Sequence, residues 1–248
     1  MDRALYIAMT GASATLKAQA THSHNLANAS TVGFQATLSA TQAMPVTGAG
    51  LASRVATAEK LVGVSDTSGA LSTTGNPLDV ALAPGHWFAV QDNNGGTAYT
   101  RAGDLRLTQN GLLTTSSGLQ LLDADGAPMV IPPNDGMDIG ADGTISVIPQ
   151  GSPASSTTQV GRLQVVQTRT TDLVRGQDSL MRQAPGAPAP TPSTGAVLST
   201  GVLESSNVDA TGALVSMIAL ARQFEMQVRV LHSGDETAQS ANSLLSSR

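Results

Sequence analysis

Residues 214–231, Leu-Val-Ser-Met-Ile-Ala-Leu-Ala-Arg-Gln-Phe-Glu-Met-Gln-Val-Arg-Val-Leu, carry apolar side chains at helical spacing. The positions that recur three and four residues apart are Leu214, Met217, Ala221, Phe224, Val228 and Leu231. A similar stripe near the N-terminus consists of Leu5, Met9, Ala12, Leu16 and Leu26. Because a lone helix cannot bury its own apolar stripe, each terminal helix needs a partner, and the other terminus is the obvious one.

The C-terminal stripe has a second interpretation. Apolar residues at this spacing also form the buried face of an ordinary core helix. The heptad pattern continues for only about three repeats, so it favours a coiled coil over a core helix by a modest margin. The stripe alone therefore leaves both structures open.

Between the two ends, the pattern changes from helical to alternating. Leu78, Val80 and Leu82 alternate with small or polar residues, as in a strand. Asp-Gly and Asn-Gly pairs, with their neighbours, predict hairpin turns at residues 92–96, 110–111, 125–126 and 142–143. Further strand-like stretches are residues 160–168, 172–181 and 196–203. Short strands with regular turns predict an antiparallel β domain.

The predicted fold class is therefore α+β. The N- and C-terminal helices would pair as a coiled-coil inner domain, with a central antiparallel all-β domain of many short strands. The expected division is residues 1–34 and 206–248 for the helical inner domain, 35–75 for an extended linker, and 76–205 for the β-rich outer domain. Within these, residues 55–64 could form a strand, and alternate prolines make 184–195 an extended loop.

Composition excludes several classes of protein. The net charge is −5 and the basic residues are scattered, which argues against a nucleic-acid partner. Cysteine is absent, so disulfides and thiolate metal sites are excluded. No stretch approaches the roughly 18 apolar residues of a membrane span. The N-terminus lacks the pattern of a cleaved signal peptide, so we expect the cytoplasm or a different export route.

The low charge content is itself informative. Charged residues make up 12% of the chain and aromatic residues 2%, so the surface must be mainly Ser, Thr, Gln, Asn and Gly. Such a surface suits a subunit that is buried in a polymer. A secreted β protein with a neutral surface is the alternative, and composition decides between them only weakly.

No pattern predicts catalysis, a metal or a cofactor. His22 and His24 are two residues apart on the expected helix and point to different faces, so they cannot share a metal as an i, i+4 pair could. The segment beginning at Asp123 resembles the start of a calcium loop, but Pro128 and Asn134 stand where the loop needs Gly and Glu. We expect no enzyme activity and no small-molecule substrate.

Four motifs in order along the chain resemble the flagellar axial family, which includes the rod and hook proteins of the bacterial flagellum. The first is the long signature from His24 to Phe34, with Asn-Leu-Ala-Asn at 25–28 and Thr-Val-Gly-Phe at 31–34. The others are residues 75–82 (Gly-Asn-Pro-Leu-Asp-Val-Ala-Leu), 98–105 (Ala-Tyr-Thr-Arg-Ala-Gly-Asp-Leu) with its continuation at 109–113, and 201–209 (Gly-Val-Leu-Glu-Ser-Ser-Asn-Val-Asp).

Within that family the chain is most similar to the proximal rod proteins. Its opening residues resemble theirs, and the interval from Phe34 to Gly75 is shorter than in distal rod proteins, which are the first alternative. The resemblance implies a structural subunit that polymerises helically into the hollow drive shaft of the basal body, crosses the periplasm and surrounds the export channel. A secreted β-rich protein that acts on the cell wall is the remaining alternative.

The resemblance also implies partners and roles. The partners would be other copies, other rod or axial proteins, and the flagellar type III export apparatus, which would export the chain without a cleaved signal. Asn25 and Asn28 would satisfy backbone groups at the helix end. Gly33 would permit the turn, and Phe34 would anchor the departing chain against the helical pair. The remaining expected assembly residues are both apolar stripes, Thr31 and Asn207.

Overall fold

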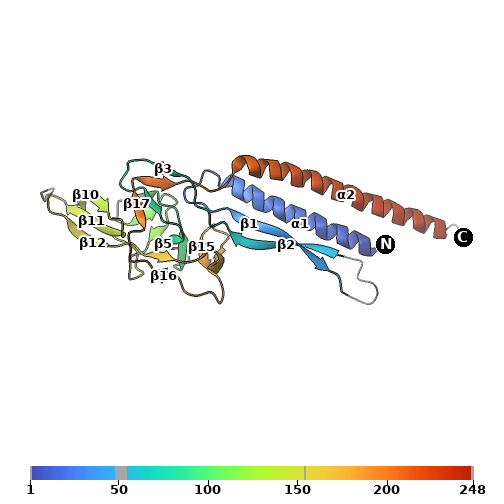
Figure 1. The fold of residues 1–248 in the computed structure, drawn as a ribbon, viewed down its shortest axis with the longest axis horizontal. Coiled ribbons are helices and arrows are strands. Elements are labelled where there is room, and N and C mark those ends of the chain that lie inside the picture. The colour runs from blue at the N-terminus through green and yellow to red at the C-terminus, as the bar shows by residue number, and fades with distance from the viewer. Residues whose placement is uncertain (1, 48–54, 154, 247–248) are drawn as a thin grey trace. The chain divides into compact units, whose positions relative to one another are not determined.

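The computed structural model describes residues 2–47, 55–153 and 155–246, which fall into two compact units. The first, here called the helical unit, comprises Met1–Ala27, Thr37–Val62 and Asp209–Arg248. The second, here called the β unit, comprises Asn28–Ala36 and Gly63–Val208. The predicted α+β class is confirmed: a helix lies at each end of the chain, with antiparallel strands between them (Figure 1).

The helical unit is built on two long helices, α1 (Asp2–Ala27) and α2 (Ala210–Ser246). They lie side by side and run in opposite directions (Figure 1). Two glycines mark the close approach. A Cβ atom added to Gly11 would lie 3.3 Å from Gln227 Nε2, and one added to Gly234 would lie 3.1 Å from a methyl carbon of Leu5. A side chain at either glycine would require the facing side chain, Gln227 or Leu5, to shift.

Strands β1 (Thr37–Pro45) and β2 (Val55–Val64) pair with each other, and β1 lies along α1. Polar contacts join β2 to the same helix, since the Thr57 amide donates to Thr10 Oγ1 at 3.3 Å. The interval 35–75, for which we expected an extended linker, thus holds two paired strands and a third, β3 (Leu71–Thr73). An isolated pair of strands is marginally stable, and α1 supplies the surface that it needs.

Local signals explain where α2 begins. Asp209 precedes the helix, and its Oδ1 accepts a hydrogen bond from the Thr211 amide at 3.1 Å. A carboxylate in this position satisfies one of the unpaired amides of the first turn and interacts favourably with the helix dipole. Asn207, two residues earlier, lies in the β unit and has a different role.

The β unit consists of short strands joined by tight turns. Its later strands are β4 (Val80–Leu82), β5 (His86–Gln91), β6 (Thr97–Thr100), β7 (Leu105–Leu107), β8 (Leu113–Thr115), β9 (Gln120–Leu121), β10 (Asn134–Ile139), β11 (Thr144–Pro149), β12 (Thr158–Arg162), β13 (Val165–Gln167), β14 (Leu173–Arg175), β15 (Met181–Gln183), β16 (Thr191–Pro192), β17 (Leu198–Thr200) and β18 (Val202–Glu204). A 3-10 turn, η1, spans Thr170–Asp172.

The main sheet of the β unit has the strand order β14-β15-β6-β5-β9-β8-β7, and β13 pairs with both β5 and β16. Strands β10, β11 and β12 form a second sheet, and two small pairs join β17 to β4 and β18 to β3. These pairings are antiparallel. The last two pairs connect the C-terminal end of the β unit to its first strands.

The predicted hairpin turns are confirmed. Gly95, Gly111, Gly126 and Gly143 all have positive φ, between 76° and 86°. At the first turn the Asp92 amide donates to the Gly96 carbonyl at 2.8 Å, which closes the hairpin between β5 and β6. Glycine tolerates this backbone conformation without the steric cost that other residues incur.

The core of the β unit is aliphatic and closed. Phe88, Leu113 and Ile145 are fully buried within one cluster that spans both larger sheets. A smaller cluster contains Trp87 and Met181, with Tyr99 packed against it. Strand β5 contributes to both clusters because its central four residues are all buried. The β unit therefore buries its own apolar surface.

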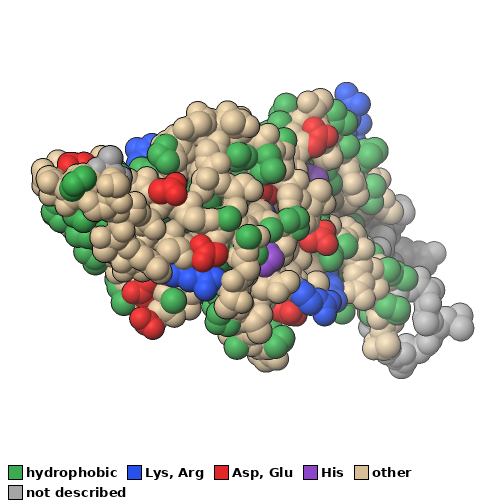
Figure 2. Space-filling view, turned by 60° about the vertical axis from the view of Figure 1, so that its left-hand side comes forward, with side chains coloured by type: hydrophobic (Ala, Val, Ile, Leu, Met, Phe, Trp, Pro, Cys, Tyr) green, Lys and Arg blue, Asp and Glu red, His purple; other side chains and the backbone are tan. Residues whose placement is uncertain are grey.

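The outer surface carries little charge. On the face shown in Figure 2, acidic and basic side chains stand singly or in small groups among neutral side chains and backbone. This matches the 12% charged residues of the sequence. In the described ranges, no helix is both long and apolar enough to cross a membrane.

Candidate assembly site

The apolar stripe predicted for the N-terminal helix lies at the edge of the buried side of α1. Ala12 is 8% exposed, and Leu5 packs close to Gly234 of α2. Met9 and Leu16, however, are 56% and 49% exposed. The four residues lie within about 60° of one another around the helix, so the chain covers one edge of the stripe and leaves the other open. The role of Met9 and Leu16 in assembly stays a prediction.

The stripe predicted for the C-terminal helix needs a smaller correction. Met217, Ala221, Phe224, Val228 and Leu231 are partly buried, but Leu214 is exposed. Among the less exposed positions of α2 is a set whose members are separated in turn by four and three residues. They are Ala213, Met217, Leu220, Phe224, Gln227, Leu231 and Gly234. The helix is apolar on more than one side, and spacing alone cannot say which of two overlapping stripes faces α1.

Both helices therefore carry apolar side chains that the chain itself does not cover. These residues, here called the outer stripes, are between 49% and 67% exposed. They are Tyr6, Met9 and Leu16 on α1 and Leu214, Val215, Ile218, Met226 and Val230 on α2. Large apolar side chains gathered on one element in this way mark an interaction surface.

The signature residue Asn25 links α1 to the hairpin. Its Nδ2 donates to the Thr37 carbonyl at 2.9 Å, and its Oδ1 accepts from the Thr37 amide at the same distance. Asn25 is buried, as is Thr37. We expected Asn25 to bond groups of the helix end itself. It bonds the first residue of β1 instead, and its neighbour Leu26 is half-buried on the same helix.

The second half of the signature forms a turn in the β unit. The Thr31 hydroxyl donates to Asn28 Oδ1 at 3.2 Å, and the Thr31 amide donates to the Asn28 carbonyl. Gly33 has φ 65°, as expected, and its amide donates to the Glu204 carbonyl at 2.8 Å. A Cβ atom at this position would lie 2.3 Å from the carbonyl group of Arg101. Backbone conformation and space both require glycine here.

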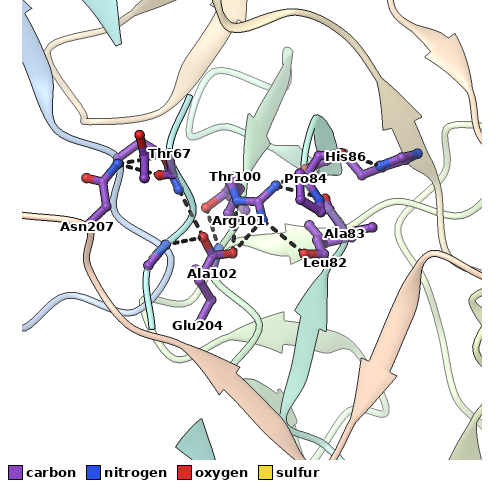
Figure 3. Close-up of polar contacts among 12 residues, drawn as sticks. Thr67, Leu82, Ala83, Pro84, His86, Thr100, Arg101, Ala102, Glu204 and Asn207 are labelled. Carbon is purple, nitrogen blue, oxygen red and sulfur yellow. Dashed lines mark hydrogen bonds and ion pairs between the residues drawn. The ribbon is translucent and has the colours of Figure 1, made fainter. Parts of the chain in front are cut away.

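A buried ion pair lies at the point where the four motifs meet (Figure 3). Arg101 and Glu204 are 3% and 1% exposed, and Arg101 Nη2 and Nε lie 2.5 Å and 3.0 Å from Glu204 Oε2. The other N–H groups of the guanidinium donate to the carbonyls of Leu82, Ala83 and His86. Glu204 Oε1 accepts from Gln35 Nε2 and the Gly69 amide. Both charges are thus fully hydrogen-bonded.

This degree of pairing is what makes two buried charges tolerable. Removing a carboxylate and a guanidinium from water costs several kcal/mol for each ion, and only good geometry with additional hydrogen bonds offsets it. The five guanidinium N–H groups of Arg101 all have acceptors. The pair therefore fixes the relative position of β18, the segment before β5 and the turn at Gly33.

Asn207 extends the network to the start of the β unit. Its Nδ2 donates to Gln35 Oε1 at 3.0 Å and to the Thr67 carbonyl at 2.7 Å. Its Oδ1 accepts from the Ala36 amide at 2.6 Å. The fourth motif is thereby tied to the residues that follow the first motif. Asn207 thus connects the backbone at Ala36 and Thr67, and it does not cap α2.

Phe34 is also placed differently from our expectation. We expected it to pack against the helical pair. The structure places its ring, 5% exposed, against Arg175 of the β unit, whose guanidinium carbon lies 4.4 Å from the ring centroid. Arg101, Glu204, Gln35 and Arg175 were not singled out by sequence reasoning. Arg101 and Glu204 could have been, because they are charged residues within motifs of a chain that has few charges.

A second polar cluster is more exposed. Arg182 donates to Asp92 Oδ2 at 2.7 Å and to both carboxylate oxygens of Asp178. These bonds hold the pKa of each aspartate below its ordinary value of 3.8. The described residues contain no cluster of His, Asp or Glu that could hold a metal ion. Asp123 Oδ1 accepts the amides of Asp125 and Ala127, as in an ordinary turn.

Comparison with known proteins places the chain in a class. Three family models match it: a flagella basal body rod protein model at residues 5–35, a flagellar hook protein FlgE/F/G D1 domain at 81–147, and a flagellar basal body rod FlgEFG protein C-terminal model at 199–244. Together with the terminal helices and the central β unit, they define an axial protein of the bacterial flagellum.

Individual relatives narrow the class further. The flagellar basal-body rod proteins FlgF of Escherichia coli and Salmonella typhimurium are 41% and 42% identical to the chain, with 99% of each chain covered. FlgG of Bacillus subtilis is 29% identical over 87% of this chain and 89% of its own length. The chain belongs to the flagellar basal-body rod protein family, among its proximal rod members. It is a structural subunit of the basal body and not an enzyme.

Proposed function

We propose that this subunit polymerises helically in the proximal rod, with α1 and α2 paired as a coiled-coil inner domain around a central channel. Copies of the chain and other axial proteins would cover its outer stripes. The rod would transmit torque and enclose the export path, and the subunit would reach it unfolded through the type III apparatus.

The outer stripes carry this proposal. Tyr6, Met9 and Leu16 follow the spacing of a heptad seam along the exposed edge of α1, next to the buried Ala12. Val215, Ile218 and the other α2 residues lie away from the less exposed positions of that helix. Burying such side chains stabilises an interface by about 25 cal/mol per Å². A helical polymer needs head-to-tail contacts of this kind that do not close into a ring.

A charge placed in an outer stripe tests the proposal. Ile218→Glu should abolish swimming when it replaces the native subunit, because the polymer would have to bury an unpaired carboxylate. Gln223→Glu is the matched control, since it adds the same charge at an exposed polar position of the same helix. The control should swim normally.

Two further measurements make the result specific. The unfolding temperature of purified Ile218→Glu should equal that of the unchanged chain, because Ile218 is 57% exposed. Export of the variant into the medium should also persist. Normal swimming by Ile218→Glu would show that the α2 outer stripe is not an assembly surface.

A further inference from the structure

Arg175 is partly buried and differs from Arg101, the buried arginine of the β unit. It ends β14, and its guanidinium stacks on the Phe34 ring. Nη1 donates to the Ser179 carbonyl at 3.1 Å, and Nη2 donates to the Gln35 carbonyl. Nε is buried and has no hydrogen-bond partner among the described residues. Two carbonyls thus serve a group with five N–H donors, whereas all five are used at Arg101.

Arg175 also has no counter-charge within the described ranges, where it forms no ion pair. The nearest acids by sequence are Asp172 and Asp178, each three residues away, and neither pairs with Arg175. Both oxygens of Asp178 are bound by Arg182 at 2.6 and 2.8 Å. Burial lowers the pKa of Arg175 to about 10. The protein therefore holds a partly desolvated cation without a neutralising acid among the described residues.

A cavity of about 320 Å³ opens beside this guanidinium. Arg175, Phe34 and Tyr99 line it, and so does Trp87. The indole Nε1 of Trp87 is a second buried donor without a partner in the described part of the chain. Two unpaired N–H donors therefore belong to residues that line this cavity, as does Asp178, whose carboxylate is paired with Arg182. An occupant that satisfied them would need acceptor atoms and negative charge.

The backbone beside the cavity is strained. Ser179 has φ 64°, the only positive φ that the described residues show outside glycine. Such a conformation costs of order 1–3 kcal/mol and persists where surrounding structure requires it, often at binding sites. Here it directs the Ser179 carbonyl to Arg175 Nη1 and so fixes the orientation of the guanidinium.

We propose that this cavity, here called the Arg175 site, binds a carboxylate group. A carboxylate is planar, accepts hydrogen bonds only, and matches the paired N–H edge of a guanidinium in a bidentate arrangement. The N–H groups of Arg175 that the two carbonyls leave unused would supply that arrangement. The cavity is large enough for one acidic side chain or a small dicarboxylate and lies at the lower limit for ligand sites.

Two sources could present a carboxylate: an acidic side chain of a neighbouring axial subunit, or a free small carboxylate. Trp87 is the single tryptophan of the chain, so the indole signal comes from one residue, which lines the Arg175 site. The first experiment titrates sodium acetate and sodium succinate into the full chain at constant ionic strength, with chloride as the balancing anion. The observable is the indole ¹H–¹⁵N resonance.

If the source is a free carboxylate, that resonance should shift and saturate. Arg175→Met should abolish the saturable shift, and Arg175→Lys should weaken binding at least tenfold, because lysine keeps the charge but lacks the planar fork. Arg106→Gln, which removes one exposed cation elsewhere in the β unit, should bind as the unchanged chain does. Arg175→Lys also serves if Arg175→Met fails to fold.

If the source is a neighbouring subunit, free acids should give no saturable shift. Trp87 emission should then change when the chain assembles, and Arg175→Lys should lose that change while Arg106→Gln retains it. A chain with neither response, in solution or on assembly, would overturn the proposal. Because Ile218 and Arg175 lie in different units, failure of this site leaves the outer-stripe test unaffected.

Discussion

The two units of this molecule differ in how they accommodate side chains that are costly to place: buried charges in the β unit and exposed apolar groups in the helical unit. The β unit buries a charged pair at Arg101 and Glu204 and supplies every hydrogen bond that the pair needs. The helical unit leaves large apolar side chains such as Tyr6, Ile218 and Val230 more than half exposed. The β unit satisfies its buried charged pair within a single chain, whereas the helical unit has apolar surface that a second chain could cover.

The difference indicates where the energy of assembly resides. A closed core and a satisfied ion pair should give the β unit its own cooperative stability. Helices need tertiary packing to be stable in water, and one covered face gives α1 and α2 only part of it. The four sequence motifs meet in the β unit, so they define how the chain enters and leaves the helices. The outer stripes lie outside those motifs for most of their length.

Removing one partner of the ion pair should cause the largest loss of stability in the β unit. Arg101→Met leaves the Glu204 carboxylate buried without its counter-charge, which costs about 3–5 kcal/mol. Urea unfolding followed by the fluorescence of Trp87, whose ring centroid lies 5.8 Å from the Arg101 guanidinium carbon, measures this loss. A loss below about 1 kcal/mol would contradict the claim that the pair organises the β unit.

The double variant supplies the control for that result. Arg101→Met combined with Glu204→Met replaces both charges with apolar groups, and such replacements are often neutral. Part of the stability should therefore return, while Gln35, the Gly69 amide and the carbonyls that Arg101 bonds remain without their partners. If the double variant is as unstable as Arg101→Met alone, the cost arises from packing at Arg101 and not from an unpaired charge.

A side chain at Gly33 should have the next largest effect. Gly33→Ala introduces a Cβ atom 2.3 Å from the Arg101 carbonyl at a φ of 65°. We expect a loss of about 2–3 kcal/mol, measured by urea unfolding. Gly118→Ala is the matched control, because φ there is 87° and nothing lies within 4 Å of the added atom. That control should lose only about 1–2 kcal/mol, and equal losses would mean that the close approach to Arg101 is unimportant.

The helical unit offers a smaller test at Asn25. Asn25→Ala leaves the amide and carbonyl of Thr37 without the two bonds that Asn25 makes with them. We expect a loss of about 1–2 kcal/mol, confined to the hairpin and the end of α1. Amide exchange of β1 measures it. Unchanged protection of β1 would show that Asn25 does not hold the hairpin to the helix.

The smallest predicted effect is on the dependence of stability on pH in acid. The guanidinium of Arg182 holds the pKa of Asp92 and Asp178 below 3.8 in the folded chain. A depressed carboxyl pKa gives stability that is present above the unfolded value of about 3.9 and is lost as the pH falls through the folded values. Between pH 5 and pH 2 the unfolding midpoint of Arg182→Gln should fall less steeply than that of the unchanged chain. The difference should equal roughly the contribution of two partly exposed ion pairs. Identical pH profiles would assign the acid sensitivity to other groups.

Much of the fold could be predicted because its signals are local. Turn glycines such as Gly111 and Gly143, the alternation at Val80 and the acid at Asp209 act within a few residues of themselves. The position of Gly33 at a helix stop was predictable for the same reason. The stripes predicted two terminal helices, although they did not predict which side of each helix would be covered.

Contacts between residues that are far apart in the sequence could not be predicted. Arg101 and Glu204 are separated by 103 residues, and nothing in either motif says that the two side chains meet. The exposure of Met9 and Leu16 depends on which side of α1 the other elements cover, and the stripe itself does not specify that side. Arg175 lies outside all four motifs, so its contact with Phe34 had no sequence signal.

Hydrogen exchange of the full chain, free and polymerised, tests the contrast between the units most directly. We predict that in the free chain the amides of β5, around Phe88 and Val90, exchange slowly while those of residues 5–26 and 214–231 exchange fast. Polymerisation should protect both helices by at least about tenfold and leave β5 unchanged. Strong protection of the helices in the free chain, with no gain on polymerisation, would contradict the view that the helical unit is completed by its neighbours.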